Sequence, residues 1–253
     1  MEVRFGLSQT DLLLCKDTLL SADERKELEN IVQRLLQREP VQYILGQEVF
    51  CGHVFHVEPG VLIPRPETAE LVLWVAEAVP SGVSLLDIGT GSGCIAISLA
   101  LMGYEATAMD VSPDALRIAQ GNADALGARV DFVLQDILHP SPTHRQWDVI
   151  VSNPPYVCQS EAADMEDNVL LHEPSLALFV PDQDPLLFYR SIALYGLDHL
   201  LPGGWLFFEI NREYARETAD MLGGYGYLQV VCRQDQFGNP RMVCARRNLN
   251  EQS

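Results

Sequence analysis

The hydrophobic pattern of the first forty residues is helical. Leucine, isoleucine and valine recur there at roughly the spacing of a helix, with charged residues on the other face, which predicts helices over residues 1 to about 39. Ser21 followed by Glu24 is a capping-box pattern and predicts that a second helix begins there. Pro40 is expected to close this segment. Two helices bury little surface alone, so the segment is expected to pack on the rest of the chain.

The next segment, residues 41–63, has the pattern of extended chain. β-Branched and aromatic residues between 48 and 57 flank Gly52, which is typical of a β-hairpin with the glycine in its turn. Pro66 follows, and proline is favoured in the first turn of a helix, so a helix is predicted over residues 67–78. The hairpin would then link the N-terminal helices to the main domain.

From residue 83 onward, short apolar runs alternate with helical patterns. Strands are predicted at 83–88, 105–109, 130–134, 147–152 and 204–210, and helices at 93–102, 113–126, 185–200 and 213–222. Such alternation predicts an α/β fold with a mostly parallel sheet covered on both faces. The last two strands, 228–233 and 242–245, leave no room for a helix between them and are expected to form an antiparallel hairpin.

The composition is that of a globular protein with a strongly acidic balance. Acidic residues outnumber basic ones 35 to 17, and the formal net charge is −18. Because duplex-binding proteins gain most of their affinity from Lys and Arg against phosphates, this balance disfavours a nucleic-acid substrate. No apolar run approaches the roughly 18 residues of a membrane-spanning helix, and the N-terminus lacks the apolar core of a signal peptide.

The cysteines and histidines predict neither a disulfide framework nor a metal site. Six cysteines are scattered without a Cys-x-x-Cys pair, which suits reduced thiols in the cytoplasm. His53 and His56 are three residues apart in a predicted strand, so they are expected on opposite faces, where they cannot share a metal. We therefore expect a cytoplasmic protein without a metal.

A glycine-rich sequence ends the first strand of the α/β pattern. Asp87-Ile-Gly-Thr-Gly-Ser-Gly93 stands directly before a helix, where glycines let the backbone turn tightly and approach a ligand. A tight turn without a ligand and a nucleotide-binding loop are the alternatives. Asp110, seventeen residues after Gly93, ends the next strand, where a carboxylate can accept hydrogen bonds from both hydroxyls of a ribose. Asp136 follows the third strand, where a side chain can meet an adenine ring.

This arrangement resembles the class I S-adenosylmethionine-dependent methyltransferases. The loop has no Gly-Lys-Ser/Thr, which excludes a P-loop NTPase, and Asp87 before the glycines disfavours a dehydrogenase. The resemblance implies a seven-stranded Rossmann-like sheet and a site for S-adenosylmethionine, with S-adenosylhomocysteine as product. By the same resemblance, the residues that bind this cofactor are Gly89, Thr90, Gly91, Ser92, Gly93, Asp110, Asp136 and Ile137, with Asn153 beside them.

The fourth strand runs directly into Asn153-Pro-Pro-Tyr156. Ligands of open α/β sheets bind at the carboxyl ends of the strands, which places this tetrapeptide beside the glycine loop. A turn stiffened by proline is the alternative interpretation.

The four residue types suit transfer of a methyl group to a planar nitrogen, whose lone pair is delocalised and poorly nucleophilic. The Asn153 oxygen and the Pro154 carbonyl can each accept one N–H, which holds the lone pair toward the methyl donor. The prolines fix φ and aim that carbonyl, while the Tyr156 ring can stack on the flat group. We therefore predict Asn153, Pro154 and Tyr156 as catalytic, and the same residues with Pro155 as substrate-binding. The transfer needs no metal and no covalent intermediate.

The motif alone leaves the substrate open, since adenine-N6, guanine-N2 and protein glutamine methyltransferases share it. The flanking segments resemble the peptide chain release factor glutamine methyltransferases, the HemK/PrmC family. The segments that carry this resemblance are Glu39-Pro-Val-Gln-Tyr-Ile-Leu-Gly46, Val61-Leu-Ile-Pro-Arg-Pro-Glu-Thr68, Glu173-Pro-Ser-Leu-Ala-Leu-Phe179, Phe188-Tyr-Arg190 and Phe237-Gly-Asn-Pro-Arg-Met-Val-Cys-Ala-Arg-Arg247. The match extends over nearly all of residues 7–247.

The resemblance implies transfer to the glutamine of the Gly-Gly-Gln loop of class I release factors, giving N5-methylglutamine. Residues 1–40 would be a short helical substrate-docking segment, 41–63 a linking hairpin and 64–253 the methyltransferase domain. We expect a monomer whose partner is the release factor, with no direct contact to nucleic acid or membrane. A nucleic-acid base methyltransferase and a non-catalytic cofactor-binding module are the alternatives.

Three features leave the substrate side open. The N-terminal helical segment is shorter than is usual in the family, and residues 180–185 replace a glycine-rich stretch. Arg65 lies between two prolines, and its position suits either a contact with cofactor or substrate or a place on the surface.

Overall fold

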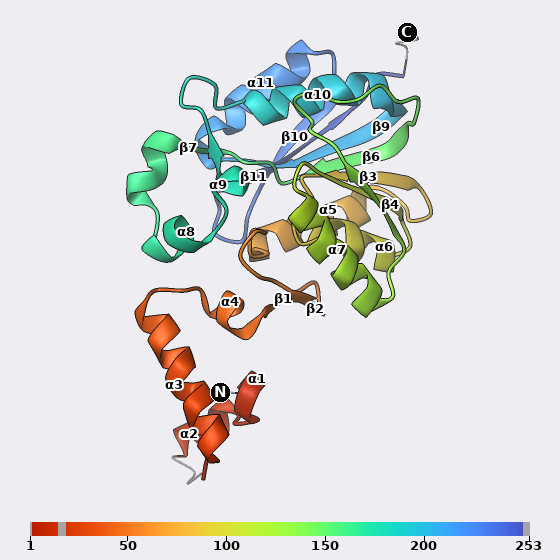
Figure 1. Cartoon of the computed structure of the whole chain (residues 1–253). Coiled ribbons are helices and arrows are strands. Elements are labelled where there is room, and N and C mark those ends of the chain that lie inside the picture. The colour runs from red at the N-terminus through yellow and green to blue at the C-terminus, as the bar shows by residue number, and fades with distance from the viewer. Residues whose placement is uncertain (1, 15–18, 250–253) are drawn as a thin grey trace.

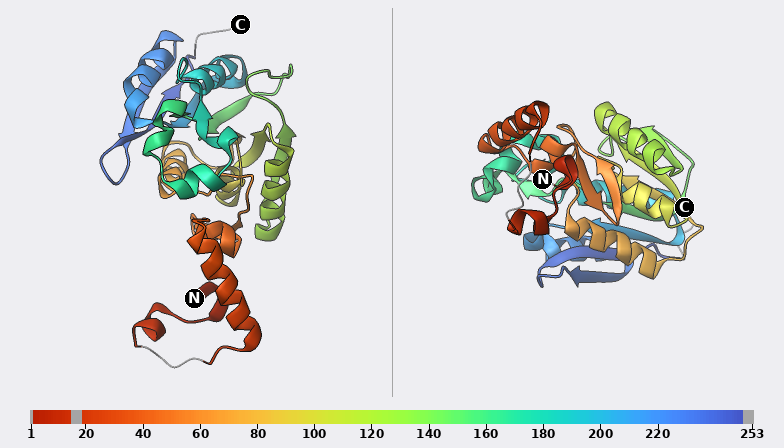
Figure 2. Two further views of the ribbon diagram at one scale, coloured as in Figure 1. Left: turned by 60° about the vertical axis from the view of Figure 1, so that its left-hand side comes forward. Right: turned by 90° about the horizontal axis from the view of Figure 1, so that it is seen from below.

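The computed structural model describes residues 2–14 and 19–249. One seven-stranded sheet lies between two layers of helices, and the N-terminal helices project from one end of this α/β body (Figures 1 and 2). Within the described ranges, no helix combines the length and the apolar character needed to cross a membrane.

In its described part, residues 2–14 and 19–40, the N-terminal segment contains three helices, and the expectation of two was wrong. They are α1 (Glu2–Phe5), α2 (Gln9–Leu13) and α3 (Ala22–Leu36). Gly6 has a φ of 62° and follows α1, while Ser8 and Asp11 exchange hydrogen bonds at the start of α2, so the chain turns between two short helices. The capping box that begins α3 is confirmed: the Ser21 hydroxyl accepts from the Glu24 N–H, and the Glu24 carboxylate accepts from the Ser21 N–H.

The linking segment begins with a helix, so the prediction of extended chain from residue 41 was wrong there. Pro40 caps α4 (Val41–Leu45), and Gly46 ends it in the left-handed conformation. A single helical turn is too short to give a periodic pattern. The hairpin itself is confirmed, with β1 (Gln47–Phe50) antiparallel to β2 (His53–His56).

The main sheet has the predicted mixed topology. Its order is β10-β11-β9-β6-β3-β4-β5, parallel from β9 to β5 and antiparallel at the C-terminal strands. The bounds are β3 (Ser84–Ile88), β4 (Glu105–Asp110), β5 (Val130–Leu134), β6 (Trp147–Ser152), β9 (Leu200–Glu209), β10 (Leu228–Gln234) and β11 (Pro240–Arg246). The chain adds β4 and β5 on one side of β3 and then β6 on the other, so the topology switches between β3 and β6.

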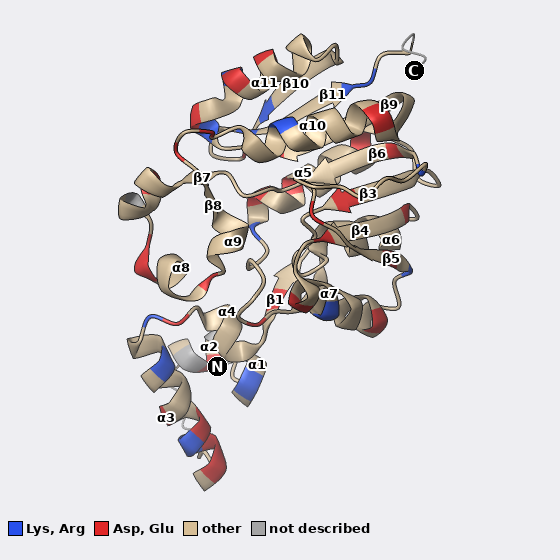
Figure 3. Cartoon of the chain, turned by 45° about the horizontal axis from the view of Figure 1, so that its top comes forward, with Lys and Arg blue, Asp and Glu red and all other residues tan. Residues whose placement is uncertain are grey.

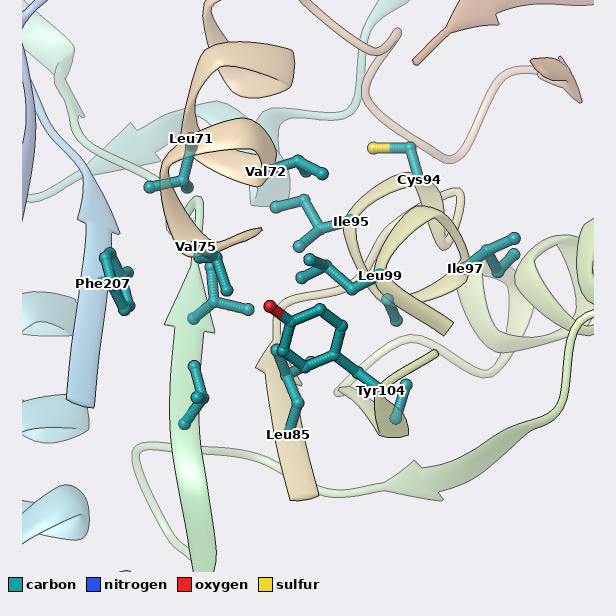
Figure 4. Packing of buried hydrophobic residues seen from close by; sticks show 14 of the residues in the cluster. Leu71, Val72, Val75, Leu85, Cys94, Ile95, Ile97, Leu99, Tyr104 and Phe207 are labelled. Atoms are coloured by element: carbon teal, nitrogen blue, oxygen red, sulfur yellow. The ribbon is translucent and has the colours of Figure 1, made fainter. Parts of the chain in front are cut away.

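Helices cover both faces of this sheet because successive strand residues point to opposite sides. On β3, Leu85 packs in the core with α5 and α6, and Leu86 packs in the core with α10. Figure 4 shows Leu85 in one cluster with side chains of α5 and α6, among them Val75 and Leu99. The helices are α5 (Pro66–Ala78), α6 (Cys94–Leu101) and α7 (Pro113–Leu126) on one face, with α10 (Leu187–His199), the 3-10 turn η2 (Arg212–Tyr214) and α11 (Ala215–Gly224) on the other.

A segment without any predicted element follows β6. It contains β7 (Val157–Cys158), the 3-10 helix η1 (Gln159–Asp164), α8 (Asp167–His172), α9 (Ser175–Leu178) and β8 (Phe179–Val180). β7 and β8 pair in parallel. Two contacts join α8 to the end of α3: Arg38 pairs with Asp167, and His172 Nε2 lies 3.3 Å from the Gln37 carbonyl oxygen. This segment therefore lies between the N-terminal helices and the carboxyl ends of the sheet (Figure 1).

Candidate active site

A cavity of about 320 Å³ opens at the carboxyl ends of the parallel strands. It lies at the switch between β3 and β6, the position at which open α/β sheets bind ligands, and its size is in the range of small-molecule sites. Its lining includes most of the residues that the sequence predicts for the cofactor and the substrate: Gly89, Thr90, Gly91, Ser92, Asp110, Asp136, Ile137, Asn153, Pro154 and Pro155.

The glycine loop leaves open space toward this cavity. Gly89 and Gly91 have φ angles of 75° and 56°, which residues with a Cβ rarely adopt. A Cβ built on either glycine would meet no atom within 4 Å, so a ligand can approach the bare backbone. The N–H groups of Gly89 and Thr90 donate to the Met109 carbonyl at 2.8 and 3.0 Å and thereby tie the loop to β4.

Asp87 stabilises the glycine loop by hydrogen bonds and does not line the cavity. Its Oδ2 accepts from the Thr90 hydroxyl at 2.6 Å and from the Ala96 N–H at 3.2 Å, so it joins the loop to α6. Its Oδ1 is buried and has no hydrogen bond in the part of the chain that the structure describes. Burial raises the pKa of this carboxyl to about 7.

Asp110 closes the loop on the β4 side. Its two oxygens accept from the N–H groups of Gly91 and Ser112, each at 2.9 Å. Each carboxylate oxygen keeps a further lone pair, so acceptance of two more hydrogens from a ribose is chemically possible. Burial raises the pKa of Asp110 from its ordinary value.

The residues that follow β5 bring both polar and apolar side chains to the site. Asp136 accepts from the Leu138 N–H at 2.8 Å and pairs with His139 at 2.9 Å, and this His139 hydrogen bond lowers the pKa of Asp136. Ile137 presents a mostly buried apolar side chain. Gln135 was not predicted as a site residue, yet it lines the cavity, and its buried Nε2 has no hydrogen bond within the described ranges. An unpaired donor and a bare glycine loop on one cavity fit a nucleoside cofactor with an amino-acid tail.

A second cavity of about 190 Å³ adjoins the first. Asn153 lines both, so it stands at the boundary between them. Tyr156 lines only the second cavity. The apolar side chains that line the second cavity come from Leu62 and from the segment after β6, namely Val157, Met165, Val169, Ala177 and Leu178.

The buried carboxylate of Glu209 is linked to both ends of the tetrapeptide, directly to Tyr156 and through Thr68 to Asn153. Asn153 Nδ2 donates to the Thr68 hydroxyl at 3.1 Å, and Thr68 donates to Glu209 Oε2 at 2.6 Å. The Tyr156 hydroxyl donates to Glu209 Oε1 at 3.1 Å. Burial raises the pKa of Glu209, and burial together with the Glu209 charge raises that of Tyr156.

Arg65 bridges the two cavities and is not a free surface residue. It lines both, and its guanidinium pairs with Glu173, whose side chain is only 1 % exposed. Glu173 also accepts from the Ile63 N–H at 3.2 Å. This pair therefore fastens the segment before α5 to the segment between α8 and α9.

Comparison with known proteins agrees with this geometry. The family model described as "PrmC N-terminal domain" matches residues 1–46, and "Methyltransferase small domain" matches residues 68–177. The release factor glutamine methyltransferase of Bacteroides thetaiotaomicron is 50% identical over 245 residues, covering 96% of this chain and 88% of that protein. That of Flavobacterium psychrophilum is 41% identical over 250 residues, with 96% and 88% covered.

The chain belongs to the release factor glutamine methyltransferase family. The 16S rRNA N2 G1207 methyltransferase of T. thermophilus, solved in complex with AdoMet and guanosine, has the same kind of fold. Its TM-score is 0.58 at 19% identity, and the match covers 80% of this chain and 50% of that one. The predicted fold, a class I methyltransferase sheet with an antiparallel C-terminal hairpin, is thereby confirmed.

Gly93 packs closely against α6 and α7 and does not line the cavity. Its φ is 83°, and an added Cβ would lie 2.7 Å from Ile97 Cδ1 and 3.0 Å from Ala119 Cβ. We expect Gly93→Ala to lower the free energy of unfolding by about 2–5 kcal/mol, from backbone strain and overpacking. Chemical denaturation measures this loss.

Gly121 provides a matched control for that change. It lies within α7, and a Cβ there would meet nothing within 4 Å. Gly121→Ala is expected to raise the free energy of unfolding by about 0.5–1 kcal/mol, because alanine favours the helix. Equal effects of the two substitutions would contradict the packing role of Gly93.

Asp87 predicts a pH dependence of stability. Its pKa is about 7 in the folded chain, against about 3.9 when unfolded, so its contribution is fully present below about pH 4 and is lost as the pH rises through 7. Asp87→Asn removes this titration. The unfolding free energy of the wild type, relative to this variant, should fall from pH 4 to 8 by up to about 1.4 kcal/mol per pH unit. Urea denaturation across this range measures the difference, and parallel curves would contradict it.

Thr68 and Glu209 are site residues that the sequence interpretation missed. A weak signal existed for each, since Thr68 lies in the first turn of a helix after two prolines and Glu209 is an acid at the end of an apolar strand. Neither signal indicates which residue is the hydrogen-bond partner. Only the fold brings them together.

Proposed function

We propose that this chain transfers a methyl group from S-adenosylmethionine to the side-chain nitrogen of the glutamine in the Gly-Gly-Gln loop of class I release factors. The products are N5-methylglutamine and S-adenosylhomocysteine. The observation that carries the proposal is the position of Asn153 between a cavity with a glycine loop and a second, mostly apolar cavity. Relatives that are up to 50% identical and bear the name release factor glutamine methyltransferase support the substrate.

The first cavity would hold the cofactor, which supplies an electrophilic methyl group on a sulfonium sulfur. Its binding residues in this proposal are Gly89, Thr90, Gly91, Ser92 and Gly93, Asp110 at the ribose, Asp136 and Ile137 at the adenine, and Asn153 near the methyl group. Gly93 would act indirectly, by allowing the loop to pack against α7. The Gln135 amide is a further donor for the bound cofactor, because it is buried and unpaired within the described ranges.

The second cavity would receive the glutamine side chain. The Asn153 oxygen and the Pro154 carbonyl each accept one hydrogen of the substrate NH2 group, which turns the nitrogen lone pair toward the first cavity. The hydroxyl of Tyr156 is bonded to Glu209, so its ring remains to stack on the flat amide, with Pro155 stiffening the turn between them. The new N–C bond would form as the C–S bond of the sulfonium breaks. The nitrogen, now cationic and acidic, would then release one proton to water, so no strong base is needed.

The charge distribution favours a protein over a nucleic acid. The lining of the second cavity contains one basic residue, Arg65, and it is paired with the buried Glu173. Lys and Arg are scattered among more numerous acidic residues over the molecule, whose net charge is −18 (Figure 3). A base methyltransferase would need a basic groove to hold phosphates beside Tyr156.

The N-terminal segment would dock the release factor. We assign residues 1–40 to docking, 41–63 to the link and 64–253 to methyl transfer. None of the α3 side chains is buried, and Val32, Leu35 and Leu36 are exposed at its C-terminal half. The match of residues 1–46 to the PrmC N-terminal domain supports a distinct N-terminal unit that includes residues 1–40.

Incubation with labelled cofactor tests the proposal. A class I release factor should be labelled, and the same factor with alanine in place of the Gly-Gly-Gln glutamine should not. Deproteinised tRNA and DNA serve as the comparison substrates. Equal labelling of both release factors, or preferential labelling of a nucleic acid, would overturn the assignment.

A further inference from the structure

Asn153 is held from behind by two residues outside its motif. We propose that Thr68 and Glu209 are positioning residues that fix the orientation of the Asn153 carboxamide. The inference rests on the proposed function, because it concerns the residue that would grip the substrate nitrogen. The three side chains come from α5, from the end of β9 and from the loop after β6, so 85 and 141 residues separate the bonded partners.

The direction of these hydrogen bonds follows from the number of hydrogens that each group can donate. Thr68 has one hydroxyl hydrogen, and it donates this hydrogen to Glu209 Oε2 at 2.6 Å. The Thr68 oxygen can then only accept from Asn153. Asn153 must therefore present its NH2 group to Thr68, as it does at 3.1 Å, and its oxygen is directed away from Thr68.

Because Thr68 and Glu209 are buried, only one orientation of the Asn153 carboxamide satisfies the hydrogen bonds. Thr68 and Glu209 are 2 % and 1 % exposed, so water cannot replace a missing partner. A carboxamide rotated by half a turn would oppose its oxygen to the Thr68 oxygen and leave both without a hydrogen. Glu209 also accepts from Tyr156 at 3.1 Å, so one buried carboxylate bonds directly to Tyr156 and, through Thr68, to Asn153.

The orientation matters because the two ends of a carboxamide have nearly the same shape and opposite polarity. With its oxygen toward the substrate, Asn153 accepts a hydrogen from the amide NH2 group. In the reverse orientation it would present hydrogens to hydrogens and repel the substrate nitrogen. Thr68 and Glu209 thus select the polarity that methyl transfer needs, and they act on the substrate nitrogen through Asn153.

The matched pair Thr68→Val and Thr68→Ser tests this role. Valine keeps the shape of threonine and removes the hydroxyl, whereas serine keeps the hydroxyl. For the full chain acting on a release factor, we expect Thr68→Val to lower kcat about 10- to 100-fold, because a misdirected group costs this much. Thr68→Ser should retain kcat within about threefold of the wild type, since it keeps the hydroxyl that bonds to Asn153.

A double-mutant cycle separates positioning from a general structural effect. In an Asn153→Ala background, Thr68→Val should cause no further loss of kcat, because the group that it orients is gone. An equal loss in both backgrounds, a wild-type kcat for Thr68→Val, or a serine variant as impaired as the valine variant would each overturn the inference.

Failure of the proposed function would look different. It would show as a wild-type chain that does not methylate the release factor, whereas failure of this inference leaves the wild type active. The contact can also be tested without turnover or variants, which covers a Thr68→Val protein that does not fold. A crystal structure of the wild type with S-adenosylhomocysteine should place Asn153 Nδ2 within hydrogen-bond distance of Thr68 Oγ1, and a longer separation would overturn the inference.

Discussion

Asn153→Ala is expected to lower kcat for methylation of the release factor by about 10²–10³-fold, with the KM for S-adenosylmethionine little changed. The reason is the position of this side chain at the boundary of the two cavities, where its Nδ2 bonds to Thr68 and its oxygen has no hydrogen-bond partner among the described residues. Without it, only the Pro154 carbonyl would hold the substrate nitrogen. Steady-state kinetics with labelled cofactor measure the loss.

Asn239→Ala is the matched control for this variant. Asn239 lies in the turn between β10 and β11, where its backbone N–H and carbonyl both bond to Asp235. The same substitution there should leave kcat within about threefold of the wild type. If Asn153→Ala also stays within this range, the predicted grip on the substrate nitrogen is wrong.

Asp110→Asn is expected to weaken S-adenosylmethionine binding by about 10- to 100-fold, since hydrogen bonds to a charged acceptor are worth about 1.5–3 kcal/mol. Both Asp110 oxygens already accept from backbone N–H groups, so an amide would oppose its own hydrogens to one of them. The substitution would also remove an acceptor for the ribose. Calorimetric titration with S-adenosylhomocysteine measures the change in Kd.

Asp124→Asn makes the same chemical change at an exposed position near the end of α7, where Asp124 bonds to Gln120. It should leave the Kd unchanged. An Asp110→Asn protein that binds the cofactor product as tightly as this control would exclude the predicted ribose contact. Thermal unfolding of both variants without ligand shows whether the loop is otherwise intact.

The parts of the fold that the sequence predicted are those governed by local patterns. Strand residues alternate between faces and helix residues repeat at about 3.6, so the elements of the sheet and most helices around it could be located from spacing alone. Turn chemistry was equally local: the capping box at Ser21 and the glycine at 52 were both confirmed. The predicted antiparallel hairpin at the C-terminus followed from its short connection.

The predictions failed where elements are too short to repeat a pattern. α4 has five residues and was expected as extended chain, and β7, α9 and β8 have four residues or fewer. Such elements are stabilised by tertiary contacts, as when the Tyr43 hydroxyl donates to the Val61 carbonyl at 2.6 Å. Propensity carries little information over so few residues.

The residues of the candidate site also fall into two groups, those that sequence patterns predicted and those that only the structure revealed. The sequence by itself determined the glycine loop, Asp110 and the Asn-Pro-Pro-Tyr motif, because each ends a parallel strand and the carboxyl ends of such strands meet at one edge. Only the tertiary structure decided that Arg65 pairs with Glu173, that Gly93 packs against α7, and that Asn153, Thr68 and Glu209 form a chain of hydrogen bonds. Those contacts join residues that are distant in sequence, and their partners are set by how the helices and strands pack, which no local pattern encodes.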